Sequence, residues 1–184
     1  MIKYANRPFR DVAEMDAALI ANWNAVVQPG DCVYHLGDLA LTNEARIEQI
    51  LAQLAGQKFL ILGNHDRTIR KSRALQWKFG WVREMAEIKI DDATAPGGRQ
   101  SITLLHYAMR VWNKSHHGAW QLYGHSHGSL RDDPHARSLD VGVDACNYSP
   151  ISYEEVRARM ALKVWQPVDH HRSEHKDTTD REED

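Results

Sequence analysis

Cysteine is scarce in this sequence, with Cys32 and Cys146 the only two among 184 residues. Two cysteines so far apart exclude a disulfide framework and fit a reducing compartment. Long hydrophobic runs are also missing, and the lack of any stretch of 18 apolar residues excludes a membrane-spanning helix. The N-terminus has no apolar segment of the signal-peptide kind. We therefore expect a cytoplasmic protein with no membrane partner.

The sequence also lacks a large excess of either sign of charge. The formal net charge is −2, so no global field attracts nucleic acid, and any recognition of phosphate must be local. Nucleic acid stays open as a substrate, and the sequence carries no signal for the oligomeric state. The length suits one domain with a real core, which we predict over residues 1–166.

The end of the chain has almost no apolar residues. Residues 167–184 contain one aliphatic side chain, Val168, together with seven acids, three bases and three histidines. Such a segment cannot bury enough surface to offset the entropy of ordering, so we predict a disordered polar tail. Its histidines either hold a metal weakly or are simply solvated.

Three segments carry helical signals. A capping box at Asp11 and Glu14 opens an amphipathic pattern that predicts a helix over 12–27. Asn43 is a suitable cap for a second helix. A second capping box at 152–155 predicts a helix near the end of the domain.

Short apolar runs bounded by turn residues predict buried strands. The predicted strands lie at 32–36, 59–62, 87–90, 101–105, 120–123 and 139–143. Strand–helix units in the first half and a strand-rich second half indicate a layered α/β fold.

Side chains that can ligate a metal directly follow four of these strands. They are Asp38, Asn64, His106 and the pair His125 and His127. In layered α/β folds the carboxyl ends of strands meet at a crevice that binds ligands, so we expect all five residues in one cleft. Glycines precede three of these groups, which allows the backbone to turn sharply there.

The residue types indicate a transition-metal site. One carboxylate, one amide oxygen and three imidazoles, without a thiolate, suit manganese, iron, zinc or nickel better than a structural thiolate zinc site. The Asp38 carboxylate has two oxygens and can bridge two cations about 3.5–4 Å apart. We expect residues 125–127 to be extended, so that both imidazoles point the same way and each serves one metal.

Taken in order, these motifs resemble the signatures of the calcineurin-like metallophosphoesterases. The matching motifs are Gly37-Asp38, Gly63-Asn64-His65-Asp66, His106 and Gly124-His125-Ser126-His127. Segments 34–38, 109–112, 116–120 and 140–144 further resemble a branch of small bacterial and phage phosphoesterases. The resemblance covers about residues 1–165. It implies a metallophosphoesterase-type α/β fold, a β-sandwich flanked by helices, with a dinuclear site at its edge.

The resemblance also implies an activity, the hydrolysis of a phosphomonoester or phosphodiester by a metal-activated water, on a small phosphorylated substrate. Asp38 bridges two divalent metals, with manganese first and iron, zinc or nickel as alternatives. The residues that complete one metal are Asn64, His106 and His125, and His127 binds the other. His65 lies beside the leaving group as a proton donor or transition-state stabiliser.

One family motif has no counterpart. The family begins with a strand that carries Asp-x-His, and nothing before Asp38 matches it. One metal therefore keeps all its ligands, whereas the other keeps only Asp38 and His127. We expect either a start upstream of Met1 or a chain with impaired activity. The alternative function is a non-catalytic or weakly active mononuclear protein that binds metal or phosphate.

Other residues are candidates for substrate contact. They are Arg7, Arg110, His116 and His117. The guanidinium forks match a phosphate, and the two histidines form a local basic patch near the site. Each could equally serve on the surface or in the structure. Trp112 is a candidate wall of the substrate site, and His35 is expected to be a buried neighbour of the ligands.

Overall fold

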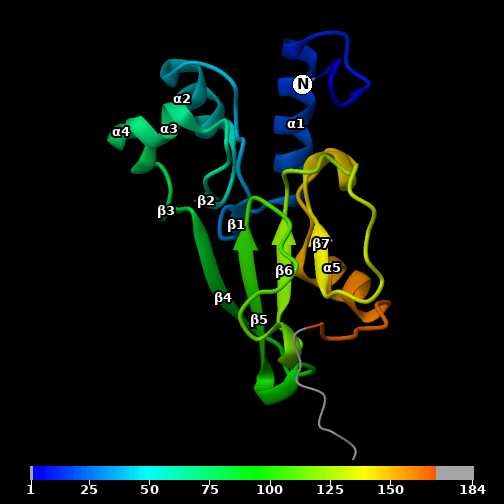
Figure 1. The fold of residues 1–184 in the computed structure, drawn as a ribbon. Coiled ribbons are helices and arrows are strands. Elements are labelled where there is room, and N and C mark those ends of the chain that lie inside the picture. Colours follow the sequence, from blue (N-terminus) through cyan, green and yellow to red (C-terminus); the bar gives the residue numbers. More distant parts are fainter. Residues whose placement is uncertain (1, 169–184) are drawn as a thin grey trace, which may run out of the picture.

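The computed structural model describes residues 2–168, which form two β-sheets and five α-helices (Figure 1). The tail predicted over 167–184 lies outside the described residues except for its first two. The mixed α/β class predicted from the sequence is therefore confirmed. None of the helices in this described part is long and apolar enough to span a membrane.

The helices begin close to their predicted caps. They are α1 (Val12–Val26), α2 (Glu44–Gln53), α3 (Arg67–Lys71), α4 (Arg73–Gln76) and α5 (Tyr153–Ala161). Asp11 caps α1 by accepting the Glu14 N–H at 2.9 Å, but the Glu14 carboxylate accepts from the Arg10 N–H instead of returning a bond to Asp11. Only one of the two hydrogen bonds of the predicted capping box is therefore formed. Helices α3 and α4 were not predicted, because each is too short to show a helical repeat.

The strands form one parallel and one mixed sheet. The first sheet, in the order β1-β2-β3, contains β1 (Cys32–His35), β2 (Gln57–Ile61) and β3 (Val82–Arg83). The second, in the order β4-β5-β6-β7, contains β4 (Met85–Asp91), β5 (Arg99–Leu105), β6 (Trp120–Tyr123) and β7 (Ser138–Asp140). Only β4 and β5 pair antiparallel in this sheet. The chain passes from β3 directly into β4 and so joins the sheets (Figure 1).

The last strand is shorter than predicted. We predicted a strand over 139–143, but β7 ends at Asp140, and residues 143–145 form a 3₁₀ turn. The Asp140 carboxylate explains the early end, because it accepts the N–H of Gly142 at 2.9 Å and that of Gly128 at 3.0 Å. Those bonds hold the backbone in turns where a strand would need it extended.

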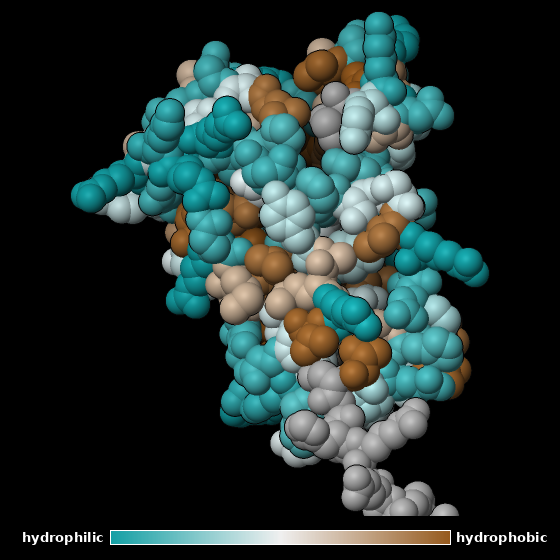
Figure 2. Space-filling model, in the orientation of Figure 1, coloured by the Kyte–Doolittle hydropathy of each residue, from teal (hydrophilic) through white to brown (hydrophobic). Residues whose placement is uncertain are grey.

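Both sheets contribute to one hydrophobic core together with α5. Its buried members are Leu36, Ile61, Ala86, Ile102, Leu104, Trp120, Leu139, Val156 and Met160. A second cluster packs helices α2 to α4 against β2. The hydrophobic residues on the face shown in Figure 2 form small groups among hydrophilic ones, not one broad patch. The shared core therefore fixes the ends of β1, β2, β5 and β6 relative to each other.

Candidate metal centre

The centre begins where two glycine turns touch. A Cβ atom on Gly37, whose φ is +96°, would lie 2.5 Å from His106 Nδ1, and one on Gly63 would lie 2.2 Å from Asp38 Oδ1. Only glycine lets the turns after β1 and β2 approach each other and His106 so closely. The chain then enters Asp38 with φ +56°, a left-handed conformation that non-glycine residues seldom adopt.

Asp66 fastens these two turns together. Its buried carboxylate accepts the N–H groups of Gly63 at 2.8 Å, Asp38 at 2.7 Å and Leu39 at 2.9 Å. No role was predicted for Asp66, although it belongs to the Gly-Asn-His-Asp motif. An aspartate three residues after a glycine signals a local turn, but its two bonds to the other loop have no sequence signal.

His106 is held with one particular nitrogen toward the other ligands. Its Nδ1 lies 2.7 Å from the backbone oxygen of Leu36, which can only accept, so Nδ1 carries the proton. Its Nε2 lies 3.0 Å from Asn64 Oδ1, 3.1 Å from His125 Nδ1 and 3.4 Å from Asp38 Oδ2. A backbone partner on the far nitrogen is the usual way to orient a metal-ligating histidine.

The atoms around His106 Nε2 suit a divalent metal. One ligand atom each from Asp38, His106 and His125 lies within 4.8 Å of the others. Together with Asn64 Oδ1, these atoms are four electron-pair donors. A single proton can bridge only two of the four atoms at a time. A divalent cation could accept from all four, and such mixed N and O ligands fit manganese, iron, zinc or nickel. We call Asp38, Asn64, His106 and His125 the ligand cluster.

The electrostatics of the cluster follow from burial and mutual contacts. Burial opposes the charged form of Asp38, but hydrogen bonds from His106 and from the His65 N–H outweigh it and lower the pKa of this carboxyl. Burial also opposes the charged form of His106, and its bonds to Asp38 and Leu36 raise its pKa on balance. The pKa of His125 is lowered by burial and by the neighbouring His106. The raised pKa of His106 and the lowered pKa of Asp38 thus share one cause, the contact between these two side chains.

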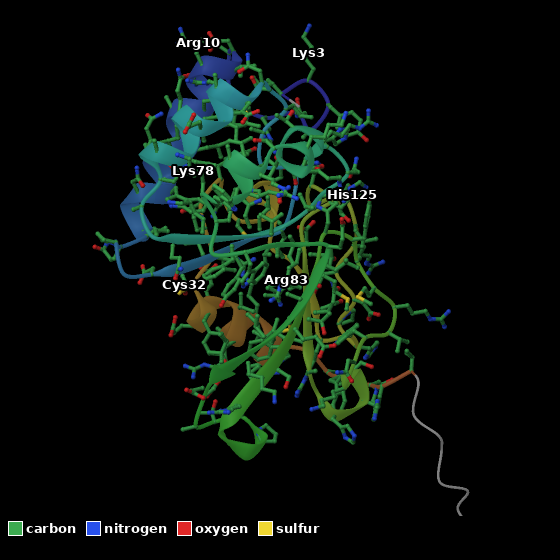
Figure 3. The ribbon with its side chains drawn as sticks, turned by 90° about the vertical axis from the view of Figure 1, so that its left-hand side faces the viewer. Lys3, Arg10, Cys32, Lys78, Arg83 and His125 are labelled. Atoms are coloured by element: carbon green, nitrogen blue, oxygen red, sulfur yellow. The ribbon has the colours of Figure 1, made fainter. Side chains whose placement is uncertain are left out.

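The cluster lies at the carboxyl ends of its strands, as predicted. Figure 3 shows Cys32, at the start of β1, on the opposite side of the molecule from His125, which follows β6. The amino end of β1 therefore lies away from the cluster. The turn after β6 is also fixed to the end of β5, because the N–H groups of Gly124 and His125 both donate to the backbone oxygen of His106. Two of the imidazoles are therefore placed by the same backbone contact.

His127 is not part of the ligand cluster, and the expectation of an extended 125–127 segment was wrong. These residues form a turn, in which His127 has φ +49° and the Ser129 N–H donates to the Ser126 oxygen at 2.8 Å. The turn directs His127 Nδ1 to Asp144 Oδ2 at 2.7 Å. The two imidazoles of the motif consequently have different partners.

Arg7 belongs to this second group. Its Nε and Nη2 atoms each donate to one oxygen of Asp144 at 2.8 Å, and both side chains are 7% exposed. Burial raises the pKa of Asp144, but the bonds from Arg7 and His127 outweigh that effect and lower it. Arg7 was a candidate for substrate phosphate or for a structural role, and its guanidinium fork holds a carboxylate of this chain. No role had been predicted for Asp144, and the contact spans 137 positions of sequence.

The remaining candidates lie around the cluster. The side chain of His65 is exposed, and its backbone N–H donates to Asp38 Oδ1 at 2.7 Å. His116 and His117 lie in a 3₁₀ turn with ring centroids 4.1 Å apart. Arg110 borders a cavity that none of the four cluster residues lines. His35 Nδ1 is buried without a hydrogen-bond partner among residues 2–168, and burial lowers its pKa.

Two curated proteins are similar to this chain over most of its length. The uncharacterized protein MJ1445 of Methanocaldococcus jannaschii is 34% identical over 161 residues, which cover 84% of this chain and 80% of that protein. The chain belongs to the MJ1445 family. Gene 66 protein of Mycobacterium phage L5 is 31% identical, over 73% of this chain and 76% of its own length.

A solved structure shares the fold of this family. The protein of unknown function AQ665 from Aquifex aeolicus superposes with a TM-score of 0.59 at 20% identity, over 86% of this chain and 91% of that one. No protein-family model matches the chain. These comparisons establish relatives and a fold, so the chemistry must be argued from the ligand cluster.

Proposed function

We propose that this protein is a metal-dependent hydrolase of phosphomonoesters or phosphodiesters, of the calcineurin-like metallophosphoesterase type. The observation that carries the proposal is the convergence of Asp38, Asn64, His106 and His125 around one point at the strand ends. The two sheets and flanking helices are compatible with the β-sandwich of that superfamily.

The residues of the cluster have separable tasks in this proposal. Asp38 supplies negative charge, and its orientation is fixed by the His65 N–H. His106, Asn64 and His125, which contact one another through His106 Nε2, would be the other ligands of the metal. A divalent cation bound there would supply Lewis-acid chemistry, lowering the pKa of water and offsetting charge on phosphoryl oxygens.

His65 is the chain's own candidate for proton transfer. Its backbone is fixed by Asp38 while its side chain is exposed beside the cluster. A histidine in that position could protonate a leaving oxygen at neutral pH. It would act on the substrate without belonging to the metal position.

Metal content and turnover together test the proposal. The full chain, reconstituted with Mn²⁺, Fe²⁺, Zn²⁺ or Ni²⁺ and desalted, is assayed for metal by mass spectrometry and for hydrolysis of p-nitrophenyl and bis-p-nitrophenyl phosphate. We expect Asp38→Asn and His125→Ala to lose both metal and turnover. His65→Ala should keep its metal and lose about a hundredfold or more in kcat, the usual size of a proton-transfer contribution. Arg10→Gln, an exposed variant, serves as the control.

One observation favours a second candidate, a mononuclear metal protein with weak or no hydrolysis. Within the described residues, Asp38, His106 and His125 are the one group of acidic and histidine side chains close enough to share an ion, and His127 is not part of it. A content of one metal per chain, without turnover of either phosphate ester, would select this candidate and contradict the enzyme. Two metals per chain with turnover would select the dinuclear hydrolase.

A further inference from the structure

A cavity of about 370 Å³ lies beside the sheet, and none of the four cluster residues lines it. Its walls come from three segments: the connection from β5 to β6, the connection from β6 to β7, and residues 165–168 after α5. Strands β5, β6 and β7 are parallel, so both connections must return along the sheet, as Figure 1 shows. The volume is within the range of small-molecule sites in proteins.

The charges around this cavity are unbalanced. Arg110, Arg131 and Arg137 line it, and the carboxylate among its lining residues is that of Asp133. That carboxylate already accepts the N–H of His135 at 2.8 Å. Within residues 2–168, no hydrogen bond or ion pair involves Arg110 or Arg131. Three arginines and one aspartate line this space, and this excess of positive charge creates a local attraction for an anion.

Arg137 is the best fixed of the three. Its guanidinium carbon lies 4.8 Å from the ring centroid of Trp165, and its Nη1 donates to the Gly118 oxygen at 3.4 Å. Gly118 has φ +85°, a left-handed conformation that glycine adopts without strain, and a Cβ there would lie 2.6 Å from this Nη1. The Nε of Arg137 is buried without a partner among the described residues. The contacts with Trp165 and Gly118 therefore fix this guanidinium beside the cavity.

Aromatic side chains supply the rest of the wall. Trp112 and Tyr123 are buried and line the cavity, and Trp165 lines it from the segment after α5. Burial, with the nearby carboxylates Asp140 and Asp132, raises the pKa of Tyr123 to about 12, so its hydroxyl stays a neutral donor. Flat rings beside guanidinium groups suit a ligand that has both a planar ring and a charged phosphate.

We infer that this cavity is a binding site for a nucleoside monophosphate or a similar ring-bearing organic phosphate. The phosphate is held by the guanidinium groups of Arg110 and Arg131 at the rim, because forked N–H donors match phosphoryl oxygens in pairs. The planar ring lies against Trp165. The site uses none of the four cluster residues, so the inference does not depend on the proposed hydrolysis.

Calorimetric titration of the full chain with AMP tests the site. Chelator is present, so that a metal at the ligand cluster cannot hold the phosphate. We expect one AMP per chain, with adenosine and ribose 5-phosphate each weaker by at least about tenfold, because each lacks one half of the recognised structure. Asp38→Asn should bind AMP like the unaltered protein.

Substitutions separate the two halves of the site. The double variant Arg110→Gln/Arg131→Gln should weaken AMP by at least about tenfold, since charged hydrogen bonds to phosphate are lost. Trp165→Leu should weaken AMP but leave ribose 5-phosphate unchanged. The control variant Arg10→Gln replaces another exposed arginine, distant in sequence. It should change the binding of neither AMP nor ribose 5-phosphate.

Three results would overturn the inference. The first is no binding of AMP at millimolar concentration. The second is equal binding by the Arg110→Gln/Arg131→Gln variant, which would remove the guanidinium groups from the site. The third is loss of AMP binding in Asp38→Asn, which would locate the nucleotide at the ligand cluster. None of these affects the metal-content and turnover results that decide the proposed function.

Discussion

At the scale of single residues, Asp66 fixes the two loops that carry ligands of the cluster. Its buried carboxylate accepts three backbone N–H groups from two loops, and these loops carry Asp38 and Asn64. A residue with no contact to the cation would therefore determine where two of its ligands lie. Such outer partners commonly matter nearly as much as the ligands themselves.

We predict that Asp66→Asn destabilises the protein by about 3 kcal/mol, because an amide presents N–H groups to N–H groups in a buried position. It should also weaken Mn²⁺ binding. The measurements are urea unfolding and calorimetric titration with Mn²⁺. Asp31→Asn is the matched control, since Asp31 accepts one exposed N–H, from Gln28 at 2.8 Å. Equal losses in the two variants would show that Asp66 is not the link between the loops.

Residue types at strand ends were enough to find most of the candidate site. Asp38, Asn64, His106 and His125 each follow a strand, and carboxyl ends of neighbouring strands converge. His127 could not be placed in the same way. Its direction depends on a turn within residues 125–128 and on Asp144, and neither follows from a spacing of two residues.

At the scale of elements, the paired turns after β1 and β2 determine how closely the ligands can approach. We predict that Gly63→Ala pushes Asp38 away, because the new Cβ would lie 2.2 Å from Asp38 Oδ1. Overpacking of this kind costs about 1–3 kcal/mol, and Mn²⁺ affinity should fall with it. Thermal unfolding and Mn²⁺ titration provide the measurements. Gly30→Ala, where a Cβ meets nothing within 4 Å, should change neither property.

The elements found from sequence were those with a long enough pattern. Capping residues and apolar spacing predicted α1, α2 and α5, and apolar runs predicted six of the seven strands. The two residues of β3 and the short helices α3 and α4 carry no periodic signal. The length of β7 was wrong because side-chain bonds of Asp140 ended it, which an apolar run cannot indicate.

Asp92 joins the β4–β5 hairpin to α5 and should make stability depend on pH. Its carboxylate accepts from the Thr94 hydroxyl at 2.6 Å and the Tyr153 hydroxyl at 2.5 Å, and these bonds lower its pKa to about 2. In the unfolded chain an aspartate has a pKa of about 3.9. The stabilisation is therefore complete above about pH 4 and is lost as the pH falls toward about 2.

We predict that Asp92→Asn lowers the melting temperature at pH 7 and that its difference from the unaltered protein shrinks as the pH approaches about 2. Melting curves from pH 7 to pH 2 measure this difference. Asp91→Asn is a suitable control, because Asp91 is an exposed neighbour that pairs only at the surface with Arg99. A constant difference across the range would show that the carboxylate charge has no part in it.

At the scale of the whole molecule, both ends of the described chain hold the segment between β6 and α5. Arg7 binds Asp144 from the N-terminal side. From the C-terminal side, Lys163 donates to Asp132 Oδ1 at 2.6 Å and to the Asp133 oxygen at 3.0 Å, with its side chain only 4% exposed. The segment carries His125, Arg131 and Arg137, so its position affects both proposed sites.

These contacts lead to opposite expectations for two truncations. Removing residues 169–184 should leave the melting temperature and metal content unchanged, because that composition offers no packing surface. Removing residues 163–184 also deletes the Lys163 contacts and the bond from the Gln166 N–H to the His135 oxygen at 2.9 Å. A loss of about 2 kcal/mol is then expected, which corresponds to about 4–8 °C in a chain of this size.

Calorimetry of both truncations and of Lys163→Met separates the causes. Lys163→Met keeps the chain length and the apolar stem but removes the buried amine, so it should show part of the loss. The longer truncation should also weaken AMP, since Trp165 is then missing from the cavity. If the shorter truncation destabilises the protein as much as the longer one, residues 169–184 contribute to the fold and their composition was misinterpreted. If neither does, the Lys163 contacts do not fix this segment.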